Sequence, residues 1–224
     1  MELFFDKFDS YEDPQNDMIG HIHSVCNSFS YGFSSGIYFL TGESDCGAWS
    51  FTASLLDGAR NEGLRCEKII LDGKTVDLSE VRKLSFHVGQ FKAYGKRKTF
   101  ASIVKKALKK SKIDYTFEDI CQKFGIDDET LMNRKMFLLS LRIWRFTAAI
   151  GLAMDKKIFV FPHLSKCRIT DTDFFWLFRV LREEDVIVLV PCSDKIIIPR
   201  EERFTVVRMN SLFHFDQEHN HEYL

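Results

Sequence analysis

The sequence contains no apolar run long enough to cross a lipid bilayer. Its two longest uninterrupted apolar segments, residues 158–162 and 186–191, are far shorter than the roughly 20 residues that a membrane-spanning helix requires. The first residues also lack the basic, apolar and small-residue order of a secretory signal peptide. We therefore expect a cytoplasmic protein that is at most peripheral at the inner face of a membrane.

The sequence also has almost no net charge and no closely spaced pair of cysteines. The 31 basic and 32 acidic residues nearly cancel to a net charge of −1, so nothing global points to nucleic acid as a partner. The six cysteines form no C-x-x-C pair, which favours scattered free thiols in a reducing compartment over disulfides or zinc. His214, His219 and His221 lie in a polar terminus without a second ligand cluster. We interpret them as a frayed tail and predict no metal site.

Apolar residues recur with the periods of both strands and helices, which predicts an α/β fold. Phenylalanine is abundant, with 22 residues, and indicates an aromatic core or interface. Residues 158–161 and 186–190 are wholly apolar, as strands of a parallel sheet covered on both faces are. The pair Asp72-Gly73 predicts a hairpin turn, and Thr116 with Asp119 predicts a helix start by a capping box. The remaining predictions are an irregular lead-in or edge strand over the first twenty residues, strands at 37–40 and 84–88, a strand hairpin at 196–198 and 204–207, and helices at 48–60, 100–112, 128–154 and 170–182.

The segment after the strand at 37–40 has the spacing of a phosphate-binding loop. Gly42 and Gly47 stand where the two glycines of G-x-x-x-x-G-K-[ST] belong. The lysine position holds Ala48 and the magnesium-binding hydroxyl position holds Trp49, whereas Ser50 supplies the next hydroxyl. Backbone amides at a helix start bind anions without side chains, so nucleotide binding by this loop stays open. The alternative is that the Trp49 indole fills the site or packs in the core.

Three segments of the chain, in this order, resemble the ATP-binding-cassette (ABC) ATPases. The run at 68–76 followed by 84–90 is similar to the stretch that ends in the Q-loop glutamine, which falls on Gln90. Residues 138–162 are similar to the signature helix that runs into the Walker B strand. The positions in register there are Arg145, Ala148, Ala149, Ala153 and Lys157, followed by an apolar run. The alternative is an unrelated α/β domain whose elements merely fall in this order.

The resemblance implies a fold and a set of partners. The fold is a P-loop NTPase-like mixed sheet flanked by helices, in one domain of residues 1–224 with an inserted helical subdomain at about 91–154. The implied partners are a transmembrane permease subunit, a second ATPase subunit, or a second copy of this chain in a homodimer. No nucleic acid is expected as a partner.

The residues that carry the family's chemistry are replaced at most matching positions. Residues 138–142 align with the LSGGQ signature but contain none of its glycines, and the Walker B aspartate and glutamate fall on Pro162 and His163. The switch histidine falls on Cys192. We interpret His163 as a strand-end residue rather than a base and predict no catalytic residue and no required cofactor, although ATP stays possible. The candidates for a vestigial nucleotide site are Gly42, Gly47, Ser50 and Gln90.

A basic stretch follows the predicted Q-loop. It contains no acidic residue among Lys92, Lys96, Arg97, Lys98, Lys105, Lys106, Lys109, Lys110 and Lys112. On the helix predicted at 100–112 the lysines lie opposite the apolar face. The stretch is interpreted either as a solvated helix face, as a contact with an anionic partner or the cytosolic leaflet, or as a nucleic-acid contact.

Together these features favour a catalytically inactive ABC-type nucleotide-binding-domain homologue that acts beside a membrane transporter. Two other functions stay open. The chain could be an ATPase that is competent only in a composite site with an intact partner, which the missing signature glycines oppose. It could also be a free-standing regulatory module that uses the same fold away from membranes.

Overall fold

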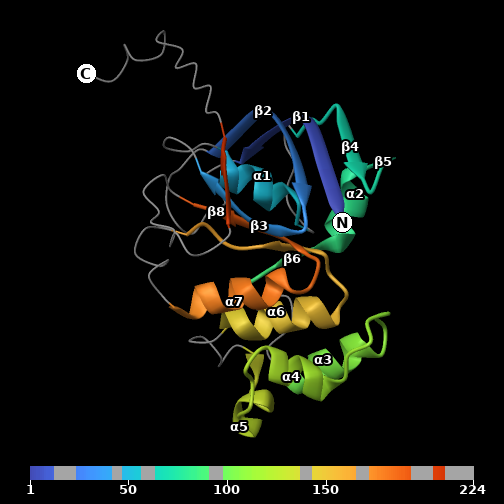
Figure 1. The fold of residues 1–224 in the computed structure, drawn as a ribbon, viewed down its shortest axis with the longest axis vertical. Helices are drawn as coiled ribbons and strands as arrows, with labels where there is room; N and C mark the ends of the chain where they lie inside the picture. The colour runs from blue at the N-terminus through green and yellow to red at the C-terminus, as the bar shows by residue number, and fades with distance from the viewer. Residues whose placement is uncertain are drawn as a thin grey trace, which may run out of the picture.

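The computed structural model describes most of the chain, namely residues 1–12, 24–41, 47–56, 64–90, 98–136, 143–164, 172–192 and 204–209. Figure 1 shows these residues in layers: an antiparallel sheet, a parallel sheet, and then helices α6 (Ile143–Ala153) and α7 (Thr172–Arg182). Helices α3 (Phe100–Leu108), α4 (Phe117–Lys123) and α5 (Glu129–Met132) lie beyond α6, at the end of the molecule opposite the antiparallel sheet. This arrangement confirms the predicted α/β class, with parallel and antiparallel strands in separate sheets.

Five strands of the described residues form the parallel sheet. In sheet order they are β6 (Ser85–His87), β7 (Ile158–Val160), β8 (Ile187–Pro191), β3 (Gly36–Thr41) and β9 (Thr205–Arg208). Each neighbouring pair is parallel. β7 and β8 are buried along their whole length, as their unbroken apolar sequences predicted. The strand predicted at 196–198 lies outside the described residues, and β9 itself pairs with β3.

Side chains of the parallel sheet alternate between two hydrophobic cores. Phe159 and Val188 pack toward α6 and α7, whereas Ile158, Val160 and Leu189 belong to the core on the opposite face. Successive residues of a strand point to opposite faces, so the three central strands β7, β8 and β3 each contribute to both cores. Both faces of the sheet are therefore covered, as expected for wholly apolar strands.

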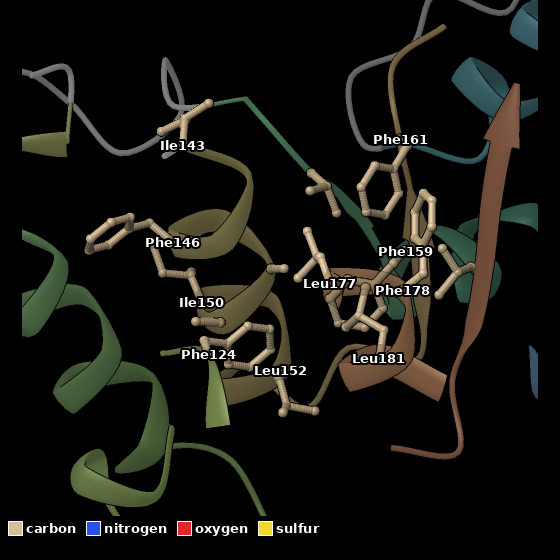
Figure 2. Close-up of a cluster of buried hydrophobic side chains, with 14 of the residues drawn as sticks. Phe124, Ile143, Phe146, Ile150, Leu152, Phe159, Phe161, Leu177, Phe178 and Leu181 are labelled. Atoms are coloured by element: carbon tan, nitrogen blue, oxygen red, sulfur yellow. The ribbon is translucent and has the colours of Figure 1, made fainter. Parts of the chain in front are cut away.

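Aromatic rings fill the core between the parallel sheet and its two helices (Figure 2). Phe178 of α7 meets Phe161 edge-on, with 5.1 Å between ring centroids. Gly151 lets α6 approach the sheet closely. A Cβ atom at that position would lie 2.7 Å from Phe159 and 2.9 Å from Phe86. The close packing of α6 on β6 and β7 thus requires a residue without a side chain.

An antiparallel sheet, with four strands among the described residues, closes the second core. Its order is β2 (Ser24–Ser34), β1 (Glu2–Glu12), β4 (Lys68–Leu71) and β5 (Lys74–Val76). The β4–β5 hairpin turns at Asp72 and Gly73, whose φ angles of 47° and 78° are the left-handed values that such a turn needs. The hairpin predicted from this pair is confirmed.

The expectation of an irregular lead-in or edge strand at the start of the chain is wrong. β1 is a central strand that pairs with β2 on one side and with β4 on the other. Leu3 and Phe5 point into the core, and so do Phe8 and Ser10, although the spacing from Phe5 to Phe8 is odd. Lys7 has a φ of 46°, and the register against β2 shifts between Phe5 and Phe8. This irregularity breaks the alternation that would otherwise have revealed the strand.

Several predicted helices are present. The first are α1 (Ala48–Ser54), α3 (Phe100–Leu108) and α4 (Phe117–Lys123). The Thr116 hydroxyl accepts the Asp119 backbone N–H, and the Asp119 carboxylate accepts the N–H of Thr116, so the predicted capping box is confirmed. α7 begins at Thr172, and its expected cap at residue 170 lies outside the described residues.

The single helix predicted at 128–154 is wrong. α5 (Glu129–Met132) is one turn long, and the chain then leaves the helical path before α6 begins at Ile143. Lys135 forms a bridge with Thr99, and the N–H of Met136 donates to the carbonyl of Lys98. These tertiary hydrogen bonds override local helix propensity. The sequence reading also missed α2 (Leu78–Leu84), which Asp77 caps.

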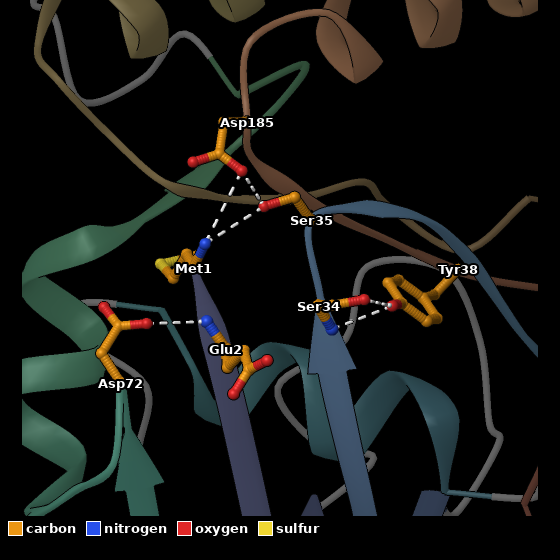
Figure 3. Close-up of polar contacts among 7 residues, drawn as sticks. All are labelled: Met1, Glu2, Ser34, Ser35, Tyr38, Asp72 and Asp185. Carbon is orange, nitrogen blue, oxygen red and sulfur yellow. Dashed lines mark hydrogen bonds and ion pairs between the residues drawn. The ribbon is translucent and has the colours of Figure 1, made fainter.

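Polar contacts join the two sheets at one edge (Figure 3). The Met1 ammonium lies 3.6 Å from the Asp185 carboxylate and 3.3 Å from the Ser35 hydroxyl, which itself donates to Asp185. The hydrogen bond from Ser35, followed by the Met1 charge, lowers the pKa of Asp185. Next to this group the Tyr38 hydroxyl accepts the backbone N–H of Ser34. These contacts hold the start of β1 against the turns that precede β3 and β8.

Candidate functional site

The phosphate-loop motif ends at the start of α1. Gly47 has a φ of 71°, a left-handed conformation suited to glycine, and its carbonyl accepts the backbone N–H of Phe51. The helix therefore begins at Ala48, as the motif predicted. Gly42, the other glycine of the motif, lies outside the described residues.

The side chains at the lysine and second hydroxyl positions point into the fold. Ala48 is 2% exposed and belongs to the core between the two sheets. Ser50 is 3% exposed, and its hydroxyl is hydrogen-bonded to that of Ser10 in β1, at 2.8 Å between the oxygens. The hydroxyl that a nucleotide site would present to its ligand is thus part of the packing between α1 and β1.

Trp49 lies in a cluster with two side chains from the end of β6. Its ring is 6.2 Å from that of His87 between centroids, at 56°. The His87 Nδ1 lies 3.3 Å from the Gln90 side-chain oxygen, to which it donates. The structure therefore brings the predicted Gln90 and the Trp49 position together through His87. Sequence reasoning missed His87, although its place three residues before Gln90 at a strand end was a usable signal.

The cluster is uncharged. Burial lowers the pKa of His87, and the hydrogen bond with Gln90 partly opposes that shift, so the imidazole is neutral at neutral pH. The Trp49 Nε1 is a buried donor without a hydrogen-bond partner among the described residues. An indole, a neutral imidazole and an amide offer no charge that could balance a phosphate. No group of three or more His, Cys, Asp or Glu side chains suited to a metal occurs in the described part of the chain.

Gln90 is positioned by contacts between the end of β6 and α6. The backbone N–H of Gly89 donates to the Thr147 hydroxyl at 2.7 Å, and Gly89 has a φ of 88°. A Cβ atom there would lie 3.1 Å from the Trp144 ring, which in turn stacks on Phe161 with 5.8 Å between centroids. A glycine is therefore required just before Gln90 for two reasons, its φ angle and the tryptophan beside it.

The positions that follow β7 and β8 are occupied by residues with structural contacts. Pro162 is half-buried and His163 is exposed. Leu164 then forms a parallel bridge with Cys192. The Cys192 thiol is buried and donates to the carbonyl of Leu40 in β3, at 3.4 Å. The residue at the switch-histidine position therefore extends the sheet instead of facing a ligand.

The sequence matches no family model and no curated protein. Solved structures do resemble the chain. A putative ATP-binding protein of an ABC transporter from Pyrococcus furiosus aligns with a TM-score of 0.59 and 12% identity, over 93% of this chain and 98% of that one. cbiO1 from Clostridium perfringens is part of the ABC transporter complex cbiONQ. It aligns with a TM-score of 0.61 and 13% identity, over 93% of this chain and 86% of that one.

A third similar structure is the ATP-binding cassette MJ0796, a dimer in a post-hydrolysis state bound to ADP and Pi. It aligns with a TM-score of 0.57 and 14% identity, over 86% of this chain and 88% of that one. In the described residues no helix is both long and apolar enough to cross a membrane. At these identities the similarity establishes the architecture alone: the chain has the fold of the ATP-binding domains of ABC transporters.

Proposed function

We propose that this chain is a catalytically inactive homologue of the ABC nucleotide-binding domain, acting as a subunit or partner of a membrane ABC transporter. The observation that carries the proposal is the packing at the start of α1. Ala48 is buried where the lysine would stand, and Trp49 lies against His87 where the magnesium-binding hydroxyl would stand. These residues do not fit a magnesium nucleotide.

The chemistry of phosphoryl transfer explains why these replacements matter. The reaction depends on positioning and on cations that neutralise charge on the transferred phosphate. One charge-assisted hydrogen bond contributes about 1.5–3 kcal/mol, and catalytic donors often contribute more. Ala48, Trp49, Pro162 and His163 supply neither the ammonium nor the carboxylates at the matching positions. We therefore expect no turnover by this mechanism.

The partners are proposed from the similar structures. cbiO1 is part of a transporter complex and MJ0796 is dimeric, which supports a permease subunit, a second ATPase subunit or a second copy of this chain as the partner. The place of action is the cytoplasmic face of a membrane. We also propose that residues 1–224 form one domain in which residues 91–154 make a helical subdomain.

Thermal unfolding with and without millimolar ATP tests the loss of nucleotide binding. A ligand at about a hundred times its dissociation constant stabilises a fold by about 2.7 kcal/mol, which for a chain of this size raises Tm by roughly 5 °C or more. We expect no shift with ATP, either with magnesium or without it. An ABC cassette with an intact lysine serves as the positive control. A shift with magnesium-ATP would contradict our interpretation of Ala48 and Trp49.

Co-purification from detergent-solubilised membranes of the source cells tests the proposed partnership. The full chain, carrying a tag, should elute with a polytopic membrane protein in constant ratio through a sizing column. If it elutes alone while a known ATPase subunit from the same membranes keeps its permease, the transporter role is wrong. The free-standing regulatory module would then be the better hypothesis.

A further inference from the structure

Helix α3 carries a cationic face that the proposed function does not use. Its buried side is apolar and consists of Phe100, Ile103, Val104 and Ala107. Lys105, Lys106 and Lys109 fall within an arc of about 100° on the opposite side. We name this surface the lysine face, together with the exposed lysines at its two ends; its members are Lys98, Lys105, Lys106, Lys109, Lys110 and Lys112.

The lysine face forms no ion pair within the part of the chain that the structure describes. No acidic residue occurs between positions 98 and 113. Among the described residues no ion pair involves any of the six lysines, whereas Lys7, Lys123 and Lys157 each pair with a carboxylate. The Lys105 ammonium contacts the ring of Phe117, 4.8 Å from its centroid, and stays exposed. The face therefore presents a concentrated positive potential to the solvent at the end of the molecule that Figure 1 shows opposite the antiparallel sheet.

The geometry points to an anionic lipid bilayer as the surface that binds this face. Clusters of four to eight basic residues on an amphipathic helix are typical of contact with anionic lipids, and the lysine face has six, of which Lys105 and Lys106 lie in α3 and the others next to its ends. The six described cations are all lysines, which act as point charges and do not grip one phosphate or base with two hydrogen bonds as an arginine does; Arg97 of the same stretch lies outside the described residues. The neighbouring aromatic rings do not offer a base-stacking platform, because Phe100 is buried and Phe117 lies under Lys105.

Binding at this face is electrostatic and does not involve insertion. The apolar side of α3 packs on α6, where the Phe100 and Phe146 rings meet edge-on with 4.8 Å between centroids. No apolar face is left to enter the lipid, so the helix rests on the headgroups. The attraction should then depend steeply on salt, because screening shortens from about 10 Å at 0.1 M to about 3 Å at 1 M. This inference does not rest on the proposed transporter role.

Co-sedimentation with lipid vesicles tests the inference. The full chain should bind phosphatidylcholine vesicles that contain about one third phosphatidylserine at low salt, and should release them at high salt. The triple variant Lys105→Gln, Lys106→Gln and Lys109→Gln should bind about a hundredfold more weakly, since each surface lysine contributes close to one kcal/mol and about 1.4 kcal/mol is tenfold. The matched control Lys68→Gln, Lys74→Gln and Lys83→Gln removes the same charge from exposed lysines elsewhere and should bind like the wild type.

Circular dichroism and Tm establish that both triple variants are folded. The inference would be overturned if the two triple variants lost vesicle binding equally. It would also be overturned if the wild-type chain bound vesicles of phosphatidylcholine alone as well as it binds the anionic vesicles. A preference for single-stranded or duplex DNA over the anionic vesicles at the same salt would overturn it as well, because the lysine face would then serve nucleic acid.

Discussion

Replacing Phe51 with alanine is expected to destabilise the protein by about 3–5 kcal/mol, a large part of the roughly 5–15 kcal/mol that holds a typical domain folded. Phe51 is fully buried in α1. Its ring meets those of Phe5, Phe8 and Phe29 edge-on, with centroid distances of 5.2, 5.0 and 4.9 Å. Three rigid rings held on two strands cannot collapse into the cavity that its removal leaves. Urea unfolding gives the free energy of unfolding directly.

The control for this variant is Phe4→Ala in β1. Phe4 is 36% exposed and is the neighbour of Phe5 on the opposite side of the strand. Removing its ring should lower the free energy of unfolding by about 1 kcal/mol or less. Equal losses for the two variants would show that the ring cluster around Phe51 is not what holds α1 to the antiparallel sheet.

Replacing Glu184 with alanine is expected to cost about 2 kcal/mol, between the values for exposed and for buried ion pairs. Glu184 follows α7, and its side chain is 6% exposed. It lies 2.5 Å from the ammonium of Lys123, whose side chain is 23% exposed, and accepts a hydrogen bond of 3.0 Å from the Tyr115 hydroxyl. Without Glu184 the partly buried ammonium has lost its partner. Urea unfolding measures the loss, and the exposed neighbour variant Glu183→Ala should change stability by no more than about 0.5 kcal/mol.

The same contact predicts an alkaline limit to stability. The hydrogen bond with Glu184 raises the pKa of Lys123, and burial followed by Glu184 raises the pKa of Tyr115. The folded state therefore holds both protons more tightly than the unfolded chain. This contribution is complete below the unfolded pKa values, about 10, and is lost as the pH rises through the higher folded values. In the Glu184→Ala variant, the free energy of unfolding should therefore decrease less steeply above about pH 10 than in the wild type. A wild-type profile that is flat there would contradict this assignment.

Where local pattern and tertiary structure agree, the sequence was sufficient to predict the fold. The unbroken apolar runs of β7 and β8, the Asp72-Gly73 turn and the Thr116 capping box each act through neighbouring residues, so a single sequence reveals them. The irregularity at Lys7 and the bridge from Lys135 to Thr99 depend on pairing with segments distant in sequence. They misled the predictions for β1 and for the helix after residue 128 for that reason.

The sequence predicted where the elements of the candidate site begin and end better than it predicted the contacts of their side chains. The glycine spacing predicted the start of α1, and His87 lies near Trp49 and is hydrogen-bonded to the predicted Gln90. The hydrogen bond between Ser50 and Ser10 could not be predicted, because it requires β1 to be a central strand facing α1. The residues matching the signature, 138–142, lie outside the described part of the chain, so the prediction there stays a prediction.

The burial of Ala48 has an evolutionary consequence. Ala48 shares its core with Phe51 and Leu55, and a lysine there would bring an ammonium group into an apolar cluster. Replacing Ala48 with lysine would therefore lower the free energy of unfolding before any bound nucleotide could raise it, and Trp49 and Pro162 would still differ from the motif. Under the function proposed here, the packing of the core around α1 opposes the evolutionary return of a lysine to this position.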